Sequence, residues 1–212
     1  MKRINLVGTA FLFILVPSIL LAQPYLLSRP GTGIAARGGT SMLATNFSIQ
    51  PYHLQTDPEW KNETIGGSGQ LLMNVGCTVC CVSMAFSQLG LLMDPKTLNA
   101  DMKKQNGFTL TGLLKWEVAS SVSGNIVVFE TPDKPSYSAI DSAIQAGNPV
   151  LAKILLWESV PHWVLIVGKN ADEYLVKNPL CQAKEIQQLS KLSARIYSIR
   201  IPKRTSAAIG IR

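Results

Sequence analysis

The sequence predicts an α+β domain, in which helices come first along the chain and an antiparallel sheet follows. Of the 212 residues, 47% are hydrophobic and 16% are charged, a composition that favours a packed core over disorder. Between residues 77 and 147, apolar residues recur at helical spacing and are bracketed by helix caps and glycines. After residue 148 the pattern changes to short apolar runs that turn residues interrupt.

Four helices are expected in the first half, over residues 77–92, 94–107, 111–121 and 136–147. Asp94, Thr111 and Ser136 are expected as N-caps, because their side-chain oxygens can accept hydrogen bonds from free N–H groups of the first turn. Gly107 and Gly147 stand where glycine commonly ends a helix.

Strands are expected over residues 125–130, 149–157, 162–168, 173–176 and 194–200. These runs are apolar or alternating, and Pro, Gly, Asn and Asp separate them, as in an antiparallel sheet. A hairpin of the strands 162–168 and 173–176 would bring His162 close to Asn178.

Residues 1–22 are typical of an export signal. Lys2 and Arg3 precede an uncharged apolar stretch over residues 4–22, which ends at the small residue Ala22. This order describes a secretory signal peptide, although the stretch also approaches the ~20 residues that cross a bilayer as a helix. We therefore expect a cleaved signal peptide or a retained membrane anchor, and both make the protein secreted or membrane-anchored, with its domain outside the cytoplasm.

Residues 23–48 are expected to form a flexible linker, because they are rich in Gly, Ser, Thr and Ala and show no periodicity. A folded domain is expected over residues 49–202, with a tail over residues 203–212. The chain has 20 Lys and Arg against 13 Asp and Glu, a net charge of +7. These charges are scattered, which favours a soluble basic surface and predicts no nucleic-acid partner.

Three of the four cysteines lie in "NVGCTVCCVSMA", residues 74–85, and the fourth is Cys181. A zinc site is disfavoured, because structural zinc usually takes four ligands in two pairs and the chain offers no second pair. A disulfide of an exported protein remains open for Cys80, Cys81 and Cys181. A disulfide does not explain the position of Cys77, directly after a glycine and at the start of an expected helix.

Cys77 has the position of a nucleophile. At a helix N-terminus, backbone N–H groups and the helix dipole stabilise a thiolate and lower its pKa. His162 heads one expected strand and Asn178 ends the next, so Asn178 could accept a hydrogen bond from one imidazole nitrogen while the other faces sulfur. The alternative is a satisfied, half-buried histidine beside a turn asparagine. The cysteine and the asparagine together favour catalysis.

Four segments follow one another along the chain: "LQTDPEW", "GCTVCCVSMAFSQLG", "DPKTLNADMKKQNGFTLTGLLKWEVAS" and "PHWVLIVGKNADEYLVKNP". Over about residues 50–200 their order resembles the C39-like peptidase group, papain-like domains related to bacteriocin-processing leader peptidases. The resemblance implies a papain-like fold. Its helical half would carry the cysteine at a helix N-terminus, and its antiparallel sheet would carry the histidine.

By this resemblance, Cys77 matches the nucleophile, His162 the base and Gln55 the glutamine of the oxyanion hole. Gln70 is a rival for the last role, because it stands seven residues before Cys77. The group often has Asp before Pro where this chain has Asn178, which can still orient the imidazole but adds no charge. The positions of two further cysteines, Cys80 and Cys81, are commonly small or hydroxylic in the group and would pack inward.

The expected function is that of a thiol-dependent hydrolase, a cysteine peptidase acting on a peptide or protein substrate without a metal or organic cofactor. One alternative is a weak or inactive papain-like domain that binds a peptide or a cell-wall component. Another is acyl transfer or amide hydrolysis on a non-protein substrate, because the same three residues serve that chemistry. Residues 4–22 add an expected attachment to the membrane if they are retained.

Overall fold

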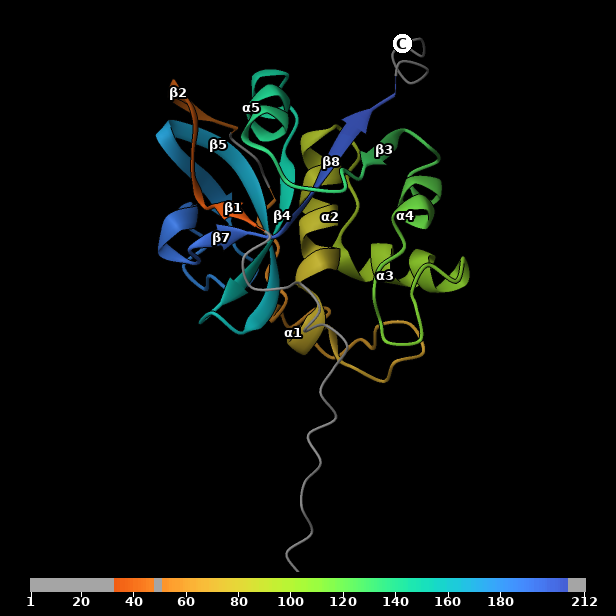
Figure 1. Cartoon of the computed structure of the whole chain (residues 1–212). Helices are drawn as coiled ribbons and strands as arrows, with labels where there is room; N and C mark the ends of the chain where they lie inside the picture. The colour runs from red at the N-terminus through yellow and green to blue at the C-terminus, as the bar shows by residue number, and fades with distance from the viewer. Residues whose placement is uncertain (1–32, 48–50, 206–212) are drawn as a thin grey trace, which may run out of the picture.

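The computed structural model describes residues 33–47 and 51–205, and it confirms the α+β class (Figure 1). The helices are α1 (Leu72–Val75), α2 (Cys77–Gln88), α3 (Pro95–Lys104), α4 (Trp116–Val122) and α5 (Tyr137–Gln145). The strands are β1 (Ile34–Ala35), β2 (Arg37–Asn46), β3 (Val127–Glu130), β4 (Val150–Leu156), β5 (Val160–Lys177), β6 (Gln187–Gln188), β7 (Arg195–Ile196) and β8 (Ser198–Arg204). A short 3-10 helix spans Leu189–Lys191. Figure 1 shows α2, α3 and α4 gathered on one side of the molecule and β1, β2, β5 and β7 on the other.

The strand pairings are antiparallel, as the sequence predicts. The main sheet has the order β2–β5–β4–β8–β3, with β6 added beside β5, and β1 pairs with β7 in a small second sheet. Alternate residues of β5 point into two cores. Leu165 and Val167 pack against the helical half, and Val164 and Ile166 pack in the core that includes α5. This burial on both faces explains why β5 reads as a nearly continuous apolar run.

Strand β5 doubles back on itself. Sixteen extended residues would separate His162 from Asn178 by roughly 50 Å, yet their side chains lie 2.8 Å apart. The chain therefore reverses near the middle of β5, where Ala171 has a φ of 53°. The chain reversal expected of the hairpin is present, and it brings together two residues that the sequence singled out.

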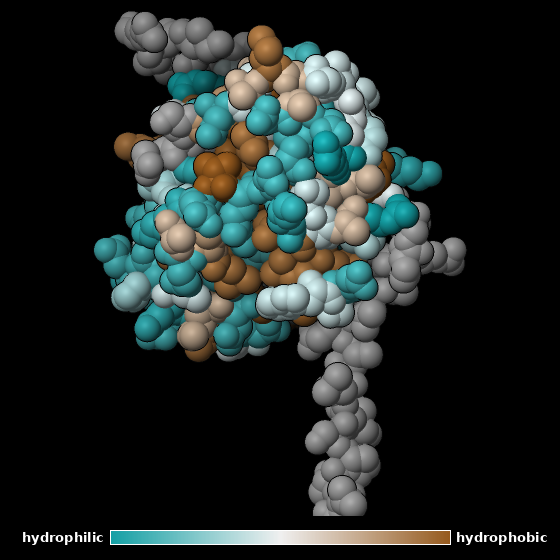
Figure 2. Space-filling model, turned by 90° about the vertical axis from the view of Figure 1, so that its left-hand side faces the viewer, coloured by the Kyte–Doolittle hydropathy of each residue, from teal (hydrophilic) through white to brown (hydrophobic). Residues whose placement is uncertain are grey.

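A tight turn between β4 and β5 fixes the register that places His162. Trp157 and Glu158 both have left-handed backbone, with φ of 50° and 61°, as in the turns that best match the twist of a hairpin. The pairing that follows sets His162 opposite Ile154. The turn also leaves Trp157 78% exposed. Figure 2 shows this sheet side of the molecule, mostly hydrophilic, with apolar residues gathered towards its lower half.

Helix α2 is the central element of the helical half, and nine of its twelve residues are buried. It packs against both α3 and β5, so it is apolar on most of its circumference. Gly76 separates it from α1, and a Cβ on this glycine would lie 2.0 Å from the Leu72 side chain and 2.4 Å from the Leu72 carbonyl oxygen. The glycine before Cys77 is therefore required because its Cα lies tightly against Leu72, one turn back in α1.

Two of the three expected helix caps are confirmed. The Asp94 side chain accepts from the backbone N–H of Thr97 at 2.9 Å, and Ser136 accepts from that of Ala139 at 3.3 Å. Both contacts join residues only three positions apart. They are therefore visible in the sequence as local patterns.

The cap expected at Thr111 is wrong, because α4 begins only at Trp116. The residues before it form a compact loop instead of a helical turn. The hydroxyl of Thr109 accepts from the backbone N–H of Leu113 at 3.0 Å, and Gly112 takes a left-handed φ of 83°. Threonine hydroxyls support such turns as readily as they cap helices.

The structure differs from the expected flexible linker over residues 23–48, because residues 33–47 belong to the fold. Here β1 pairs with β7, and β2 forms an edge of the main sheet beside β5. The side chains of β2 are mostly exposed, so they lack the apolar alternation by which a strand is found in a sequence. At the other end β8 runs through Arg204, two residues into the expected tail.

The expected signal or anchor over residues 1–22 lies outside the described residues. Within the described ranges, no helix is both long and apolar enough to cross a membrane.

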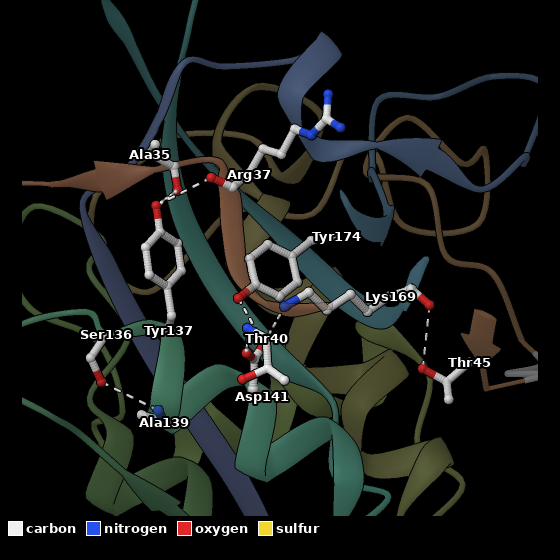
Figure 3. A network of polar contacts seen from close by, with 10 residues as sticks. All are labelled: Ala35, Arg37, Thr40, Thr45, Ser136, Tyr137, Ala139, Asp141, Lys169 and Tyr174. Atoms are coloured by element: carbon white, nitrogen blue, oxygen red, sulfur yellow. Dashed lines mark hydrogen bonds and ion pairs between the residues drawn. The ribbon is translucent and has the colours of Figure 1, made fainter. Parts of the chain in front are cut away.

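A buried polar cluster holds β2 against the rest of the domain (Figure 3). The Asp141 carboxylate on α5 accepts from Lys169 Nζ at 2.7 Å, from the Tyr174 hydroxyl at 2.8 Å and from the backbone N–H of Thr40 at 2.7 Å. The side chains of Lys169 and Asp141 are only 0% and 6% exposed. A Cβ on Gly39 would lie 2.4 Å from the same carboxylate, so β2 approaches it with its bare backbone.

Candidate active site

Cys77 is the first residue of α2 and is buried, with 8% of its surface exposed. Burial alone would raise the pKa of its thiol. The charge of His162 and hydrogen bonding with that ring outweigh burial, with further hydrogen bonds from the Trp163 backbone and from Thr78. The result is a lowered pKa, as a nucleophilic cysteine requires.

His162 lies on β5 and is buried, with 3% of its surface exposed. Burial alone would lower the pKa of its imidazole, because it disfavours the charged form. The negative charge of Cys77, hydrogen bonding with that sulfur and a hydrogen bond with Asn178 reverse the effect, and the pKa is raised. A lowered thiol pKa beside a raised imidazole pKa favours a thiolate–imidazolium pair.

The contacts of Asn178 fix which nitrogen of His162 carries hydrogen. The backbone N–H of Leu180 points at Asn178 Oδ1 from 3.0 Å, and an N–H can only donate, so this atom is the amide oxygen. The same oxygen lies 2.8 Å from His162 Nε2. Nε2 must therefore be the protonated nitrogen. The other nitrogen, Nδ1, is left to exchange a proton with the Cys77 sulfur.

Two residues that the sequence did not single out hold Asn178 in place. The Tyr52 hydroxyl accepts from the backbone N–H of Asn178 at 2.9 Å and donates to its carbonyl at 3.1 Å. The side-chain Nδ2 of Asn178 donates to Gln187 Oε1 at 3.0 Å. Neither residue carries a local sequence signal, because Tyr52 lies 126 positions from Asn178 and Gln187 sits on a two-residue strand.

Gln55 lies between α1 and the turn after Asn178. Its Nε2 donates to the Met73 carbonyl at 2.7 Å, and its backbone N–H donates to the Pro179 carbonyl at 3.0 Å. The side chain is buried, and its Oε1 has no hydrogen-bond partner among the described residues. Since a primary amide has two N–H groups, the contact with Met73 leaves one N–H of Gln55 for another acceptor.

Gln70, the rival of Gln55, lies in the loop before α1. It is half-buried, and its backbone carbonyl accepts from the N–H of Ile65 at 2.8 Å. Gln55 is hydrogen-bonded both to Met73, shortly before Cys77, and to Pro179, directly after Asn178. The hydrogen bonds described above give Gln70 no such link.

The other cysteines have a different character from Cys77. Cys80 and Cys81 are fully buried, and burial, followed by the charge of Cys77, raises the pKa of both thiols. The Cys81 thiol donates to the Trp163 carbonyl at 3.4 Å. All four cysteines lie in the described part of the chain and are free, so the structure contains none of the disulfides left open for Cys80, Cys81 and Cys181.

No group of three or more His, Cys, Asp and Glu side chains that could hold a metal ion occurs within residues 33–47 and 51–205. The polar side chains described above are the Cys77 thiol, the His162 imidazole, the Tyr52 hydroxyl and the amides of Asn178, Gln187 and Gln55.

Comparison with known proteins bears on the fold. No family model matches the sequence, and no curated protein is similar enough to match it. The structure of a candidate C39-like peptidase from Bacillus anthracis is similar to this one, with a TM-score of 0.52 and 14% sequence identity, over 78% of this chain and 100% of the other. At that identity the likeness shows the fold alone, and it agrees with the papain-like arrangement of helices and antiparallel sheet predicted from the sequence.

Proposed function

We propose that this protein is a cysteine peptidase that cleaves peptide bonds through Cys77, His162 and Asn178. The observation that supports the proposal best is the orientation of the His162 ring, whose Nε2–H donates to Asn178 and whose Nδ1 is thereby free for the sulfur. The lowered pKa of Cys77 and the raised pKa of His162 are the shifts that thiol hydrolysis needs. The fold of a candidate peptidase is consistent with a peptide or protein substrate.

The reaction would proceed in two steps. The Cys77 thiolate attacks the peptide carbonyl carbon, forming a C–S bond while the carbonyl electrons move to oxygen. As the intermediate collapses, the C–N bond breaks and His162 Nδ1–H protonates the departing amine. The neutral ring then takes a proton from water, and the resulting hydroxide displaces sulfur from the thioester, releasing a carboxylic acid and restoring the thiolate.

Gln55 would stabilise the developing oxyanion through its remaining Nε2–H, together with the backbone N–H of Cys77. We expect Gln55→Ala to lower kcat by about 10²-fold to 10³-fold with little change in KM, the loss typical of removing one oxyanion donor. The matched control is Gln70→Ala, which should stay near wild type, with thermal unfolding measured for both. A normal kcat in Gln55→Ala together with a large loss in Gln70→Ala would assign the role to Gln70 instead.

The proposal is tested with a diverse peptide library that is incubated with the full-length protein under reducing conditions and read by mass spectrometry. We expect new peptide termini that are absent when Cys77→Ala replaces the wild type. Equal products from the two proteins would contradict peptidase activity. Peptides that bind without being cleaved would favour the inactive binding domain. The expected export through residues 1–22 remains a separate prediction.

A further inference from the structure

The amide of Asn178 has one productive orientation and one reversed orientation. In the productive one, Oδ1 accepts from both His162 Nε2 and the Leu180 backbone N–H. Rotation of the amide by half a turn would present the two hydrogens of Nδ2 to these donors. His162 would then have to turn an unprotonated Nε2 towards Asn178 and carry its hydrogen on Nδ1, where it cannot accept the thiol proton.

With its Oε1 facing Asn178, Gln187 adds to the Leu180 backbone N–H in favouring the productive orientation. Its Oε1 accepts a hydrogen bond from Asn178 Nδ2 at 3.0 Å in the productive orientation. In the reversed orientation Asn178 would present its Oδ1 to Gln187 Oε1, and this hydrogen bond would be lost. Asn178 is 7% exposed, which makes an unpaired N–H there unfavourable. The pairing of β6 with β5 places Gln187 beside Asn178, because its register sets Gln187 opposite Val176, two residues before Asn178.

We propose that Gln187 is a positioning residue: its Oε1 holds the Asn178 amide in the orientation that keeps hydrogen on His162 Nε2 and leaves Nδ1 for Cys77. The catalytic consequence rests on the proposed peptidase function, whereas the tautomer of His162 can be measured without any substrate. If an aspartate stood at position 178, its carboxylate would need no such acceptor, because its two oxygens are equivalent. An asparagine at this position needs an acceptor on its nitrogen side, and Gln187 supplies it.

The experiment compares three variants of the full-length protein: Gln187→Leu, Gln187→Glu and, as a control on the same strand, Gln188→Leu. Gln188 is exposed and is the neighbour of Gln187 on β6. Nitrogen NMR of the imidazole rings, recorded at a pH where His162 is neutral, reports which ring nitrogen carries hydrogen. The chain has only two histidines, so the His162 signals are identified by comparison with His162→Ala.

In the wild type and in Gln188→Leu, we expect His162 to carry hydrogen on Nε2. Gln187→Leu should give a mixture of the two tautomers and lower kcat by about 10-fold to 100-fold at similar KM, the range found for residues that orient metal-binding histidines. Gln187→Glu keeps an acceptor and should restore the Nε2–H tautomer. It should also raise the imidazole pKa above that of the wild type, because a carboxylate nearby favours the charged ring.

A wild-type tautomer and pH profile in Gln187→Leu would overturn the proposal, and so would loss of the Nε2–H tautomer in Gln187→Glu. If Gln187→Leu does not fold, the neutral isostere Gln187→Met takes its place. Gln187→Met should then give the mixture of tautomers, and Gln187→Glu should keep the Nε2–H tautomer. Failure of the proposed function is distinguishable from failure of this inference. A protein that cleaves no peptide but shows the expected tautomer shift keeps Gln187 as the positioning residue of a silent site.

Discussion

Cys77→Ala is expected to lower peptide cleavage by roughly 10⁴-fold or more, because without sulfur no acyl-enzyme can form. Cys77 is the only one of the three clustered cysteines whose thiol pKa is lowered, and it alone stands at the N-terminus of α2. The measurement is the rate at which each variant cleaves a peptide found in the library screen. Thermal unfolding of each variant verifies that the fold is intact.

The matched control is Cys80→Ser on the same helix. Cys80 is fully buried one turn beyond Cys77, and its raised pKa keeps it a thiol. A serine there can donate to the Gly76 carbonyl, which already accepts from the Cys80 backbone N–H at 3.0 Å. We therefore expect Cys80→Ser to retain most of the activity. Turnover that survives in Cys77→Ala and disappears in Cys80→Ser would show that the nucleophile is misassigned.

Lys169→Met is expected to destabilise the protein by about 3–5 kcal/mol, the cost typical of removing one partner of a buried ion pair. Lys169 has no exposed surface, and its removal leaves the Asp141 carboxylate buried with one strong donor fewer. Urea unfolding measures the loss of free energy. Hydrogen exchange at the Thr40 amide, which donates to the same carboxylate, should also become faster, because this contact holds β2 in place.

The control for this prediction is the exposed pair of Arg37 and Asp172, which are 2.9 Å apart with side chains 61% and 40% exposed. Exposed ion pairs contribute little, since water screens both charges. Asp172→Asn should therefore leave the urea midpoint close to that of the wild type. A loss in Lys169→Met as small as that in Asp172→Asn would mean that the buried cluster does not anchor β2.

The sequence predicts those parts of the fold and site that depend on neighbouring residues. Asp94 and Ser136 cap helices through contacts three positions away. His162 and Asn178 meet because two apolar runs flank a turn, and the period of such runs is visible in one sequence. The position of Cys77 follows from a glycine and an apolar helical pattern. For these residues, the structure that the neighbouring sequence favours is the structure that the fold contains.

Other features could not be predicted, because their causes lie far apart in the chain. The edge strand β2 shows no apolar alternation, and a carboxylate on α5, about a hundred positions away, holds it in place. Tyr52 and Gln187 hold Asn178 through long-range contacts that only the fold creates. A glutamine on a two-residue strand resembles any surface glutamine until its partner is known.

The central claim, a thiolate–imidazolium pair of Cys77 and His162, is tested most directly by the pH dependence of Cys77 alkylation with iodoacetamide, followed by mass spectrometry. A lowered pKa means that the thiolate persists to lower pH, so the wild type should still react at a pH where an ordinary thiol, with a pKa of about 8.5, is largely protonated. In His162→Ala the charge that lowers the pKa is gone while burial still raises it, so the profile should move to higher pH. Identical profiles for wild type and His162→Ala, or reaction of Cys77 only above about pH 8.5, would contradict the pair.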